Sequence, residues 1–299
     1  MSMLANVFGV MAAVSVTSPT APLAPLPTAA PVEQTVVAPV KRKPESLGLR
    51  TTSPSMFVAD VASGRVLFAK DPHRVMPIAS LTKVMTAMVF LDSQPDWGKV
   101  VEFRAEDFDG ESTPVFVIGE RMTLREVFDS MLIGSVNASA NIIARETGGK
   151  AAFVARMNEK ARQLNLKTPV FVEPSGIEPA NRASAADVAA MLVTGAGYAE
   201  IRDASKRSEV VIQSRIGRKE YRIKSTNLLL TTDLNKNKYR IVTAKTGSLP
   251  EAGFCMGQVT TIGPGREVVV VELGNDNHFS RYQDIKNLTY WAFDTYEWR

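Results

Sequence analysis

The feature that most constrains this chain is a nearly continuous apolar segment, residues 77–91, which contains a serine and a lysine three positions apart. Between Val84 and Leu91 only one side chain, a threonine, is polar. A helix that is apolar on nearly all sides is usually buried, and residues three apart share one helix face. The segment therefore predicts a buried helix on which the Ser80 hydroxyl can meet the Lys83 amine.

This serine–lysine pair supports two interpretations. Burial disfavours the charged form of a lysine and lowers its pKa, so a neutral Lys83 can accept the proton of Ser80 and make that serine a nucleophile. Alternatively, Lys83 lies at the rim of a core helix and extends its ammonium group into water. By chance alone, a chain of this size holds about one Ser-x-x-Lys. The pair alone therefore does not establish a nucleophile and its base, and other residues must support that hypothesis.

Composition indicates a globular protein and narrows the classes of function. The chain has 299 residues and 45% hydrophobic content, enough for a large core. Its 35 basic and 31 acidic residues are spread along the sequence, so we expect no nucleic-acid binding. The single cysteine, Cys255, excludes an internal disulfide. His73 and His278 lack ligand spacing and are expected to be surface or loop residues. We therefore expect no zinc site, and the composition indicates no obligatory protein partner.

The first 45 residues differ in composition from the rest of the chain. Met3–Val16 is a run of small and apolar side chains that resembles the apolar part of a secretion signal and is too short to span a bilayer. It lacks a basic region and a clear cleavage site, which a misplaced start codon would explain. Residues 17–44 are rich in Ser, Thr, Ala and Pro and predict an extended tether. We expect export to the periplasm or cell envelope, with either cleavage or retention of this leader.

Residues 46–299 predict a single domain in which a helical insert, about residues 101–194, interrupts a sheet formed by about 46–100 and 195–299. Residues 106–120 and the region around Gly195 and Gly197 are expected to be irregular. The expected strands are 55–60, 65–69, 100–103, 209–213, 220–224, 241–244, 253–260 and 267–273, and the expected helices are 77–91, 124–132, 138–146, 151–164, 185–193 and 280–298.

Short turns between consecutive strands predict an antiparallel sheet. Ser63-Gly64 supplies such a turn near the start of the domain, and residues 263–265 supply another near its end. The closing helix has apolar and aromatic side chains at helical spacing, from Tyr282 to Tyr296. We expect that stripe to be core and to pack against the sheet.

Two further short motifs follow Ser-x-x-Lys. Residues 135–137, Ser-Val-Asn, connect two expected helices, and residues 245–247, Lys-Thr-Gly, end an expected strand. The lysine and threonine suit an anionic substrate group, and the glycine permits close approach. Each motif is weak alone, because residues 139–141 and 225–227 also fit Ser-x-Asn, a nearby Ser-x-Asn serine could be a helix cap, and Lys245 could be a solvated strand-edge residue.

The order of the three motifs, Ser-x-x-Lys, Ser-x-Asn and Lys-Thr-Gly, matches the set found in class A β-lactamases and penicillin-binding proteins. Over about residues 46–298 the chain resembles the low-molecular-mass penicillin-binding proteins, the serine D-alanyl-D-alanine carboxypeptidase/endopeptidase family. Residues 171–177 and 251–253 are similar to the same family. The resemblance implies an α/β (α+β) fold of the β-lactamase/DD-peptidase type, an antiparallel sheet flanked by helices with an all-helical subdomain.

The resemblance also implies three catalytic residues. Ser80 would attack the carbonyl between two D-alanines and form an acyl-enzyme, while Lys83 takes its proton. Ser135 would help return a proton to the leaving amine. The implied partners are peptidoglycan peptides as substrates and β-lactam antibiotics as covalent inhibitors, without a metal or cofactor.

Five residues are implied to bind the substrate. Asn137 would hold a peptide carbonyl, Lys245 and Thr246 would bind the terminal carboxylate, and Gly247 would allow the close approach. The backbone N–H of Ser248, with that of Ser80, would form the oxyanion hole.

Two other positions bear on this assignment. Arg281 is a further candidate for carboxylate binding. Val136 departs from the commoner pattern of the family, and because only its side chain changes we expect little mechanistic effect.

Two alternatives remain. A β-lactamase needs a glutamate that activates water, and Glu178–Asn181 has a similar pattern with a spacing one residue shorter. A catalytically silent wall-binding protein could keep the same fold. Within the peptidases, the chain ends at Arg299 without the further β-rich domain of many carboxypeptidases, and residues 46–50 precede its first strand. These features look most like the endopeptidase branch known as penicillin-binding protein 7.

Overall fold

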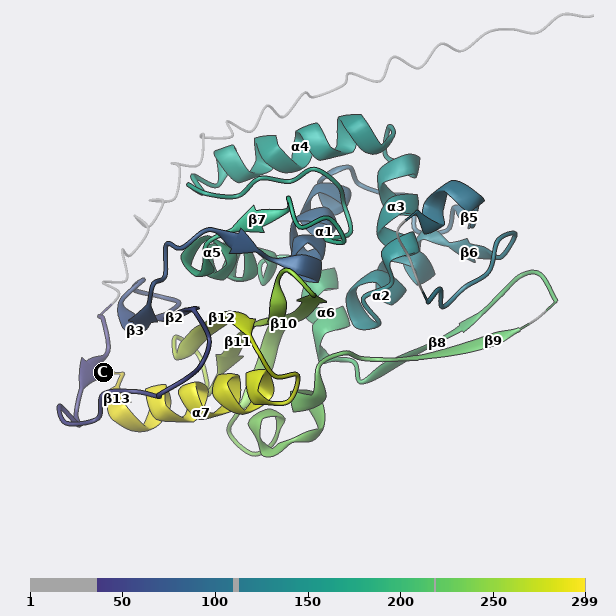
Figure 1. The fold of residues 1–299 in the computed structure, drawn as a ribbon. Helices are drawn as coiled ribbons and strands as arrows, with labels where there is room; N and C mark the ends of the chain where they lie inside the picture. The colour runs from purple at the N-terminus through teal and green to yellow at the C-terminus, as the bar shows by residue number, and fades with distance from the viewer. Residues whose placement is uncertain (1–36, 110–112, 218, 299) are drawn as a thin grey trace, which may run out of the picture. The chain divides into compact units, whose positions relative to one another are not determined.

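The centre of the fold is a five-stranded antiparallel sheet in the order β10-β11-β12-β2-β3 (Figure 1). A computed structural model describes residues 37–109, 113–217 and 219–298. The predicted N-terminal hairpin is confirmed, and it pairs with strands from the C-terminal part of the chain. Strand β10 is at the edge. The strands are β2 (Ser55–Asp60), β3 (Val66–Lys70), β10 (Arg240–Leu249), β11 (Gly253–Thr261) and β12 (Glu267–Asn275).

The two faces of this sheet contribute to separate apolar cores, because successive side chains on a strand point to opposite sides. Val268 and Val270 of β12 pack in one core with α7 (Ser280–Thr295). Val269 and Val271 pack in the other core, which includes α1 (Thr82–Asp92) and α5 (Ala185–Gly195). The predicted packing of the closing helix on the sheet is confirmed, although the helix ends at Thr295.

The apolar segment that contains Ser80 forms the predicted buried helix. It begins with a 3₁₀ turn, η1 (Ala79–Leu81), and continues as α1, of which every residue from Thr82 to Phe90 is buried. The helix ends at Asp92, before Gln94 and the proline that follows it, as expected from the missing N–H of proline. Ser80 therefore lies in the first turn of a helix whose position is determined by apolar contacts on all sides.

The predicted helices of the insert are present, with ends that differ by one or two residues from the expected ones. The first of these helices, which begins at Leu124, starts at a capping box in which Thr123 and Glu126 satisfy each other's backbone N–H groups. The elements are β5 (Val100–Glu102), η2 (Ala105–Phe108), β6 (Arg121–Thr123), α2 (Leu124–Ile133), α3 (Asn137–Glu146) and α4 (Lys150–Gln163).

The loop predicted around Gly195 and Gly197 is present, but two other features of residues 195–224 were not predicted. A helix, α6 (Ala199–Lys206), follows the loop; it has only two turns and buries only Ile201 and Ala204. Strands β8 (Glu209–Gln213) and β9 (Glu220–Lys224) do not join the central sheet; among the described residues they pair with each other and contact α2. Their alternating pattern predicts strands correctly, but it does not specify the partner.

Short elements complete the fold. The predicted tether lies mostly outside the described residues, but its end is paired: β1 (Val40–Lys41) forms a two-stranded sheet with β13 (Tyr296–Glu297). Among the described residues, no helix is both long and apolar enough to cross a membrane. The remaining elements are β4 (Met76–Pro77), β7 (Arg182–Ala183), η3 (Leu228–Thr231) and η4 (Asp233–Asn235).

Candidate active site

Ser80 and Lys83 meet as predicted. The Lys83 Nζ atom lies 2.9 Å from Ser80 Oγ, 2.6 Å from Asn137 Oδ1 and 2.6 Å from the carbonyl oxygen of Ser175. Lys83 is fully buried, whereas Ser80 lines a cavity. The lysine amine is therefore fixed between the helix of the nucleophile, the start of α3 and the loop that contains Ser175.

The loop at residues 173–176 is folded around a buried carboxylate. Glu173 Oε2 accepts hydrogen bonds from the backbone N–H and the hydroxyl of Ser175, each at 2.6 Å. Its Oε1 accepts from the backbone N–H of Gly176 at 2.5 Å and from Asn181 Nδ2 at 2.7 Å. Because these bonds set the turn, they also direct the Ser175 carbonyl at Lys83.

Two glycines let neighbouring segments approach the backbone of the nucleophile. A Cβ atom on Gly176 would lie 2.9 Å from the Ser80 nitrogen, and one on Gly247 would lie 3.1 Å from the same atom. Ala79 has a φ of 47°, in the left-handed region that is costly for residues with a side chain. The turn before Ser80 is thus held in a strained conformation between the 173–176 loop and β10.

Ser135 pairs with the second lysine of the site. Lys245 Nζ donates to Ser135 Oγ at 2.7 Å and to the carbonyl of Thr246 at 3.0 Å. Lys245 is 2% exposed, and among the described residues it forms no salt bridge. Burial, reinforced by the charges of Lys83 and Arg281, lowers the pKa of Lys245 well below its usual value. An anionic ligand beside this amine would favour its charged form and so raise its pKa again.

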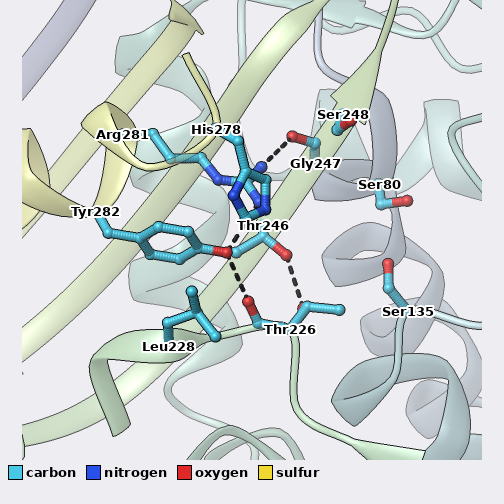
Figure 2. Close-up of a pocket in the computed structure, with 10 residues that line it drawn as sticks. All are labelled: Ser80, Ser135, Thr226, Leu228, Thr246, Gly247, Ser248, His278, Arg281 and Tyr282. Carbon is cyan, nitrogen blue, oxygen red and sulfur yellow. Dashed lines mark hydrogen bonds between the residues drawn. The ribbon is translucent and has the colours of Figure 1, made fainter. Parts of the chain in front are cut away.

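The predicted residues converge on one cavity of about 320 Å³ (Figure 2). Ser80 and Ser135 lie on one side of it, and Thr246, Gly247 and Ser248 of β10 also line it. Lys83, Asn137 and Lys245 do not line the cavity, but both lysines reach it through their hydrogen bonds to the two serines. Every site residue predicted from the sequence thus lies in or directly behind this cavity.

Four lining residues were not predicted as site residues. Thr226 Oγ1 hydrogen-bonds to Thr246 Oγ1 at 2.7 Å, and Tyr282 donates its hydroxyl proton to the Thr226 carbonyl at 2.8 Å. Leu228 and His278 also line the cavity. His278 is an exposed loop residue, as expected, but its ring also packs against Tyr282 at the cavity.

Arg281, the further candidate for carboxylate binding, lines the same cavity. Its Nη1 donates to the Gly247 carbonyl at 2.8 Å and its Nη2 donates to the Tyr282 hydroxyl at 2.9 Å. The guanidinium also lies over the rings of Phe254 and Tyr282, 5.3 Å and 4.7 Å from their centroids. It is therefore a rigidly held cation beside β10.

Two of the competing sequence matches lie outside the cavity. Ser139 is fully buried and its hydroxyl pairs with that of Ser130 at 2.8 Å, so this Ser-x-Asn serine stabilises the contact between two helices. Glu178, the candidate for a water-activating glutamate, is exposed and does not line the cavity. Among the described residues, no group of three or more His, Cys, Asp or Glu side chains has the geometry to hold a metal ion.

Fold and site together define a class. One cavity lies at the edge of an antiparallel sheet that is flanked by helices. Two serines line it, and each is hydrogen-bonded to a different lysine. This is the arrangement of a serine hydrolase that acts through an acyl-enzyme. The chain belongs to the family described as D-alanyl-D-alanine carboxypeptidase (peptidase S11), which matches residues 40–277. It is thus a serine-type D-alanyl-D-alanine peptidase.

Individual relatives agree with this assignment. A D-alanyl-D-alanine endopeptidase of Pseudomonas aeruginosa is 34% identical over 234 residues, which cover 76% of this chain and 74% of the relative. A D-alanyl-D-alanine endopeptidase of Escherichia coli is 28% identical over 264 residues, 87% of this chain and 82% of the relative. The Streptomyces K15 DD-transpeptidase shares the fold, with a TM-score of 0.75 and 21% identity over 83% of this chain and 99% of that one.

Proposed function

We propose that the protein cleaves peptide cross-links of peptidoglycan as a DD-endopeptidase, through an acyl-enzyme on Ser80, with release of terminal D-alanine as a second activity. The main support is the contact of 2.9 Å between the buried Lys83 amine and the Ser80 hydroxyl in a cavity. The endopeptidase branch is further supported by the names of the two relatives described above.

In the first step, Lys83 accepts the proton of Ser80. A neutral lysine amine has two N–H donors and one lone pair. Asn137 Oδ1 and the Ser175 carbonyl, each 2.6 Å from Nζ, can only accept hydrogen bonds, so they take the two N–H groups. The lone pair is then directed at Ser80 Oγ, which donates its proton as it attacks the substrate carbonyl.

Attack by Ser80 Oγ forms a tetrahedral intermediate, and its oxyanion would be held by the backbone N–H groups of Ser80 and Ser248. The carbon–nitrogen bond then breaks and leaves an ester on Ser80. The leaving nitrogen takes a proton from Ser135, which regains one from the Lys245 amine, 2.7 Å from its hydroxyl. Water finally attacks the ester, giving the shortened peptide and free Ser80.

Substrate binding uses groups that the site leaves available. Asn137 uses its Oδ1 for Lys83, so its side-chain amide N–H₂ is the group that would hold a substrate carbonyl. The carboxylate on the leaving residue would lie at Thr246, next to the buried Lys245 amine, with Arg281 close by. That carboxylate would stabilise the charged form of Lys245.

Location follows from the substrate. Peptidoglycan lies outside the cytoplasmic membrane, so we propose that the protein is exported to the periplasm or cell envelope and takes part in cell wall biogenesis and cell shape. β-Lactam antibiotics, which present a reactive carbonyl beside a carboxylate, would acylate Ser80 and act as covalent inhibitors.

The test uses two substrates. Wild-type protein and the Ser80→Ala variant are incubated separately with a pentapeptide and with cross-linked muropeptide dimers. We expect monomers from the dimers, some free D-alanine from the pentapeptide, and neither product with Ser80→Ala. Replacement of Ser208, an exposed serine outside the cavity, by alanine is the control. Free D-alanine without monomers would disprove the endopeptidase assignment, and no product from either substrate would disprove the peptidase mechanism.

A further inference from the structure

The cavity has a second wall that the mechanism above does not use. Leu228 and Tyr282 lie across from Ser80 and Ser135, with the two threonines between the two sides, and His278, which overlaps Thr246 in this view, also lines the cavity (Figure 2). Leu228 is 45% exposed and presents its apolar side chain to the cavity, whereas Tyr282 is only 5% exposed. Apart from the Arg281 guanidinium, which lies over the Tyr282 ring, the wall is therefore apolar and aromatic, and it lies in the same cavity as Ser80.

This wall is built before a substrate arrives. The Tyr282 hydroxyl is fixed by the Thr226 carbonyl at 2.8 Å and by Arg281 at 2.9 Å. The His278 ring contacts those of Phe254 and Tyr282, with 5.5 Å between centroids in each case. Rigid side chains of this kind lose little conformational entropy when they bind a ligand.

The chemistry of the two substrate classes gives such a wall a role. In a terminal D-alanine, and in a cross-link whose leaving residue is a diamino dicarboxylic acid, the carbon that bears the leaving nitrogen also bears a carboxylate. The two leaving residues differ in the side chain: a methyl group in D-alanine, and in the cross-link a chain of methylene groups that continues into a second stem peptide. Binding of the carboxylate cannot distinguish them, so discrimination depends on contacts with that side chain.

The position of the carboxylate sets where this side chain lies. With the scissile carbonyl at Ser80 and the carboxylate at Thr246, the leaving residue occupies the space between the serines and the second wall. A methyl group would fill little of a cavity of about 320 Å³, whereas methylene groups could reach Leu228 and the two rings.

We propose that Leu228, His278 and Tyr282 form the binding site for the side chain of the leaving residue, and that this site gives the enzyme its preference for a long methylene side chain over a methyl group. The proposal rests on the peptidase function proposed above. It adds the class of leaving group and the residues that select it.

The test compares two synthetic peptides that end in D-alanyl-D-alanine or in D-alanyl-D-norleucine, whose longer side chain consists only of carbon and hydrogen. The quantity measured is the ratio of kcat/KM for the norleucine peptide to that for the alanine peptide. For wild-type protein we expect a ratio of about ten, the discrimination that a few methylene contacts provide. Leu228→Ala and His278→Ala should each bring the ratio towards one.

Two controls make the result specific. His73→Ala removes the other histidine, which is exposed and does not line the cavity, and should keep the wild-type ratio. Labelling by fluorescent penicillin verifies that Ser80 is still assembled in each variant, and His278→Phe, which keeps an aromatic ring, should retain most of the preference.

The proposal is overturned if the wild-type enzyme prefers the alanine peptide, or if Leu228→Ala and His278→Ala both label with penicillin and keep the wild-type ratio. Either result would leave the peptidase function intact. A wild-type protein that neither labels nor cleaves either peptide would instead disprove the function itself, and this proposal with it.

Discussion

On the face of the central sheet covered by α7, the side chains around Val268 and Val270 are mainly apolar, and they include the fully buried Ile285 and Leu288 of the helix. In the cleft between β10 and η1, by contrast, Lys83 and Lys245 are buried, the former against Asn137 and a carbonyl oxygen. Burial of apolar surface stabilises a fold, whereas burial of an amine costs free energy that hydrogen bonds only partly offset. The first region thus holds the protein together, and the second uses some of that stability to prepare an acylation site.

The largest effect expected in the cleft is that of Lys83→Met. Without a proton acceptor at Ser80, the second-order rate constant for acylation by penicillin should fall by about 10³-fold. Methionine keeps the apolar contacts of the lysine stem but leaves Asn137 Oδ1 and the Ser175 carbonyl without their donor, so the midpoint of thermal unfolding should fall modestly while the protein remains folded. Lys206→Met, at an exposed lysine of α6, serves as the matched control. Labelling of Lys83→Met at the wild-type rate would remove this lysine from the role of base.

The corresponding change on the apolar face is Leu288→Ala. Leu288 is fully buried between α7 and the sheet, so its truncation should lower the free energy of unfolding by about 3 kcal/mol. Denaturant titration measures this loss. The folded variant should still label with penicillin at the wild-type rate, and a drop in that rate under fully native conditions would contradict the proposed separation of the two regions.

A smaller loss of activity is expected from Glu173→Gln. Glutamine keeps the shape of Glu173, but its side-chain N–H₂ would face the N–H donors of Ser175 or those of Gly176 and Asn181. The turn should loosen and the Ser175 carbonyl should no longer fix Lys83, so we expect acylation to slow by about tenfold and its pH profile to shift. Rate constants for penicillin labelling across pH measure both effects.

The control for that variant is Glu178→Gln, which changes an exposed glutamate five residues further along the same segment. It should leave both the rate and the pH profile unchanged. If the two variants behave alike, Glu173 has no positioning role.

The last expected effect depends on pH and concerns the exception on the apolar face, Glu272. This side chain is fully buried, and burial raises its pKa from 4.5 to about 8. Between these two values the folded protein holds a proton that the unfolded chain has lost, so stability should decline as pH rises through this range. Glu272→Gln should remove this slope, as measured by thermal unfolding at several pH values. Glu251→Gln, at an exposed turn, should retain it, and a wild-type protein whose stability rises over the range would contradict the assignment.

The sequence predicts which segments form helices and strands better than it predicts which of these segments pair or pack with one another. Apolar runs and motif order predict the buried helix and the positions of Ser80, Lys83 and Lys245, because these depend on neighbours in the chain. The pairing of β8 with β9 outside the central sheet depends on contacts with α2, which no local pattern encodes. A short helix such as α6 has too few turns for a clear periodicity.

The second wall of the cavity was missed for the same reason. Residues 225–227 match Ser-x-Asn, but that match does not indicate that the fold places Thr226 beside Thr246. His278 lies after β12, in a polar stretch that is typical of a loop. Its contact with Tyr282 depends on the packing of α7 against the sheet. The chemical role of a residue can be predicted from the local sequence, but its position relative to distant segments of the chain cannot.

The most direct test of the acyl-enzyme mechanism is to map the site of penicillin attachment by mass spectrometry. After brief labelling and trypsin digestion, the added mass should be confined to the peptide that contains residues 75–83, and it should be absent in Ser80→Ala. Attachment at any other peptide, or no attachment to the wild-type protein, would contradict the account.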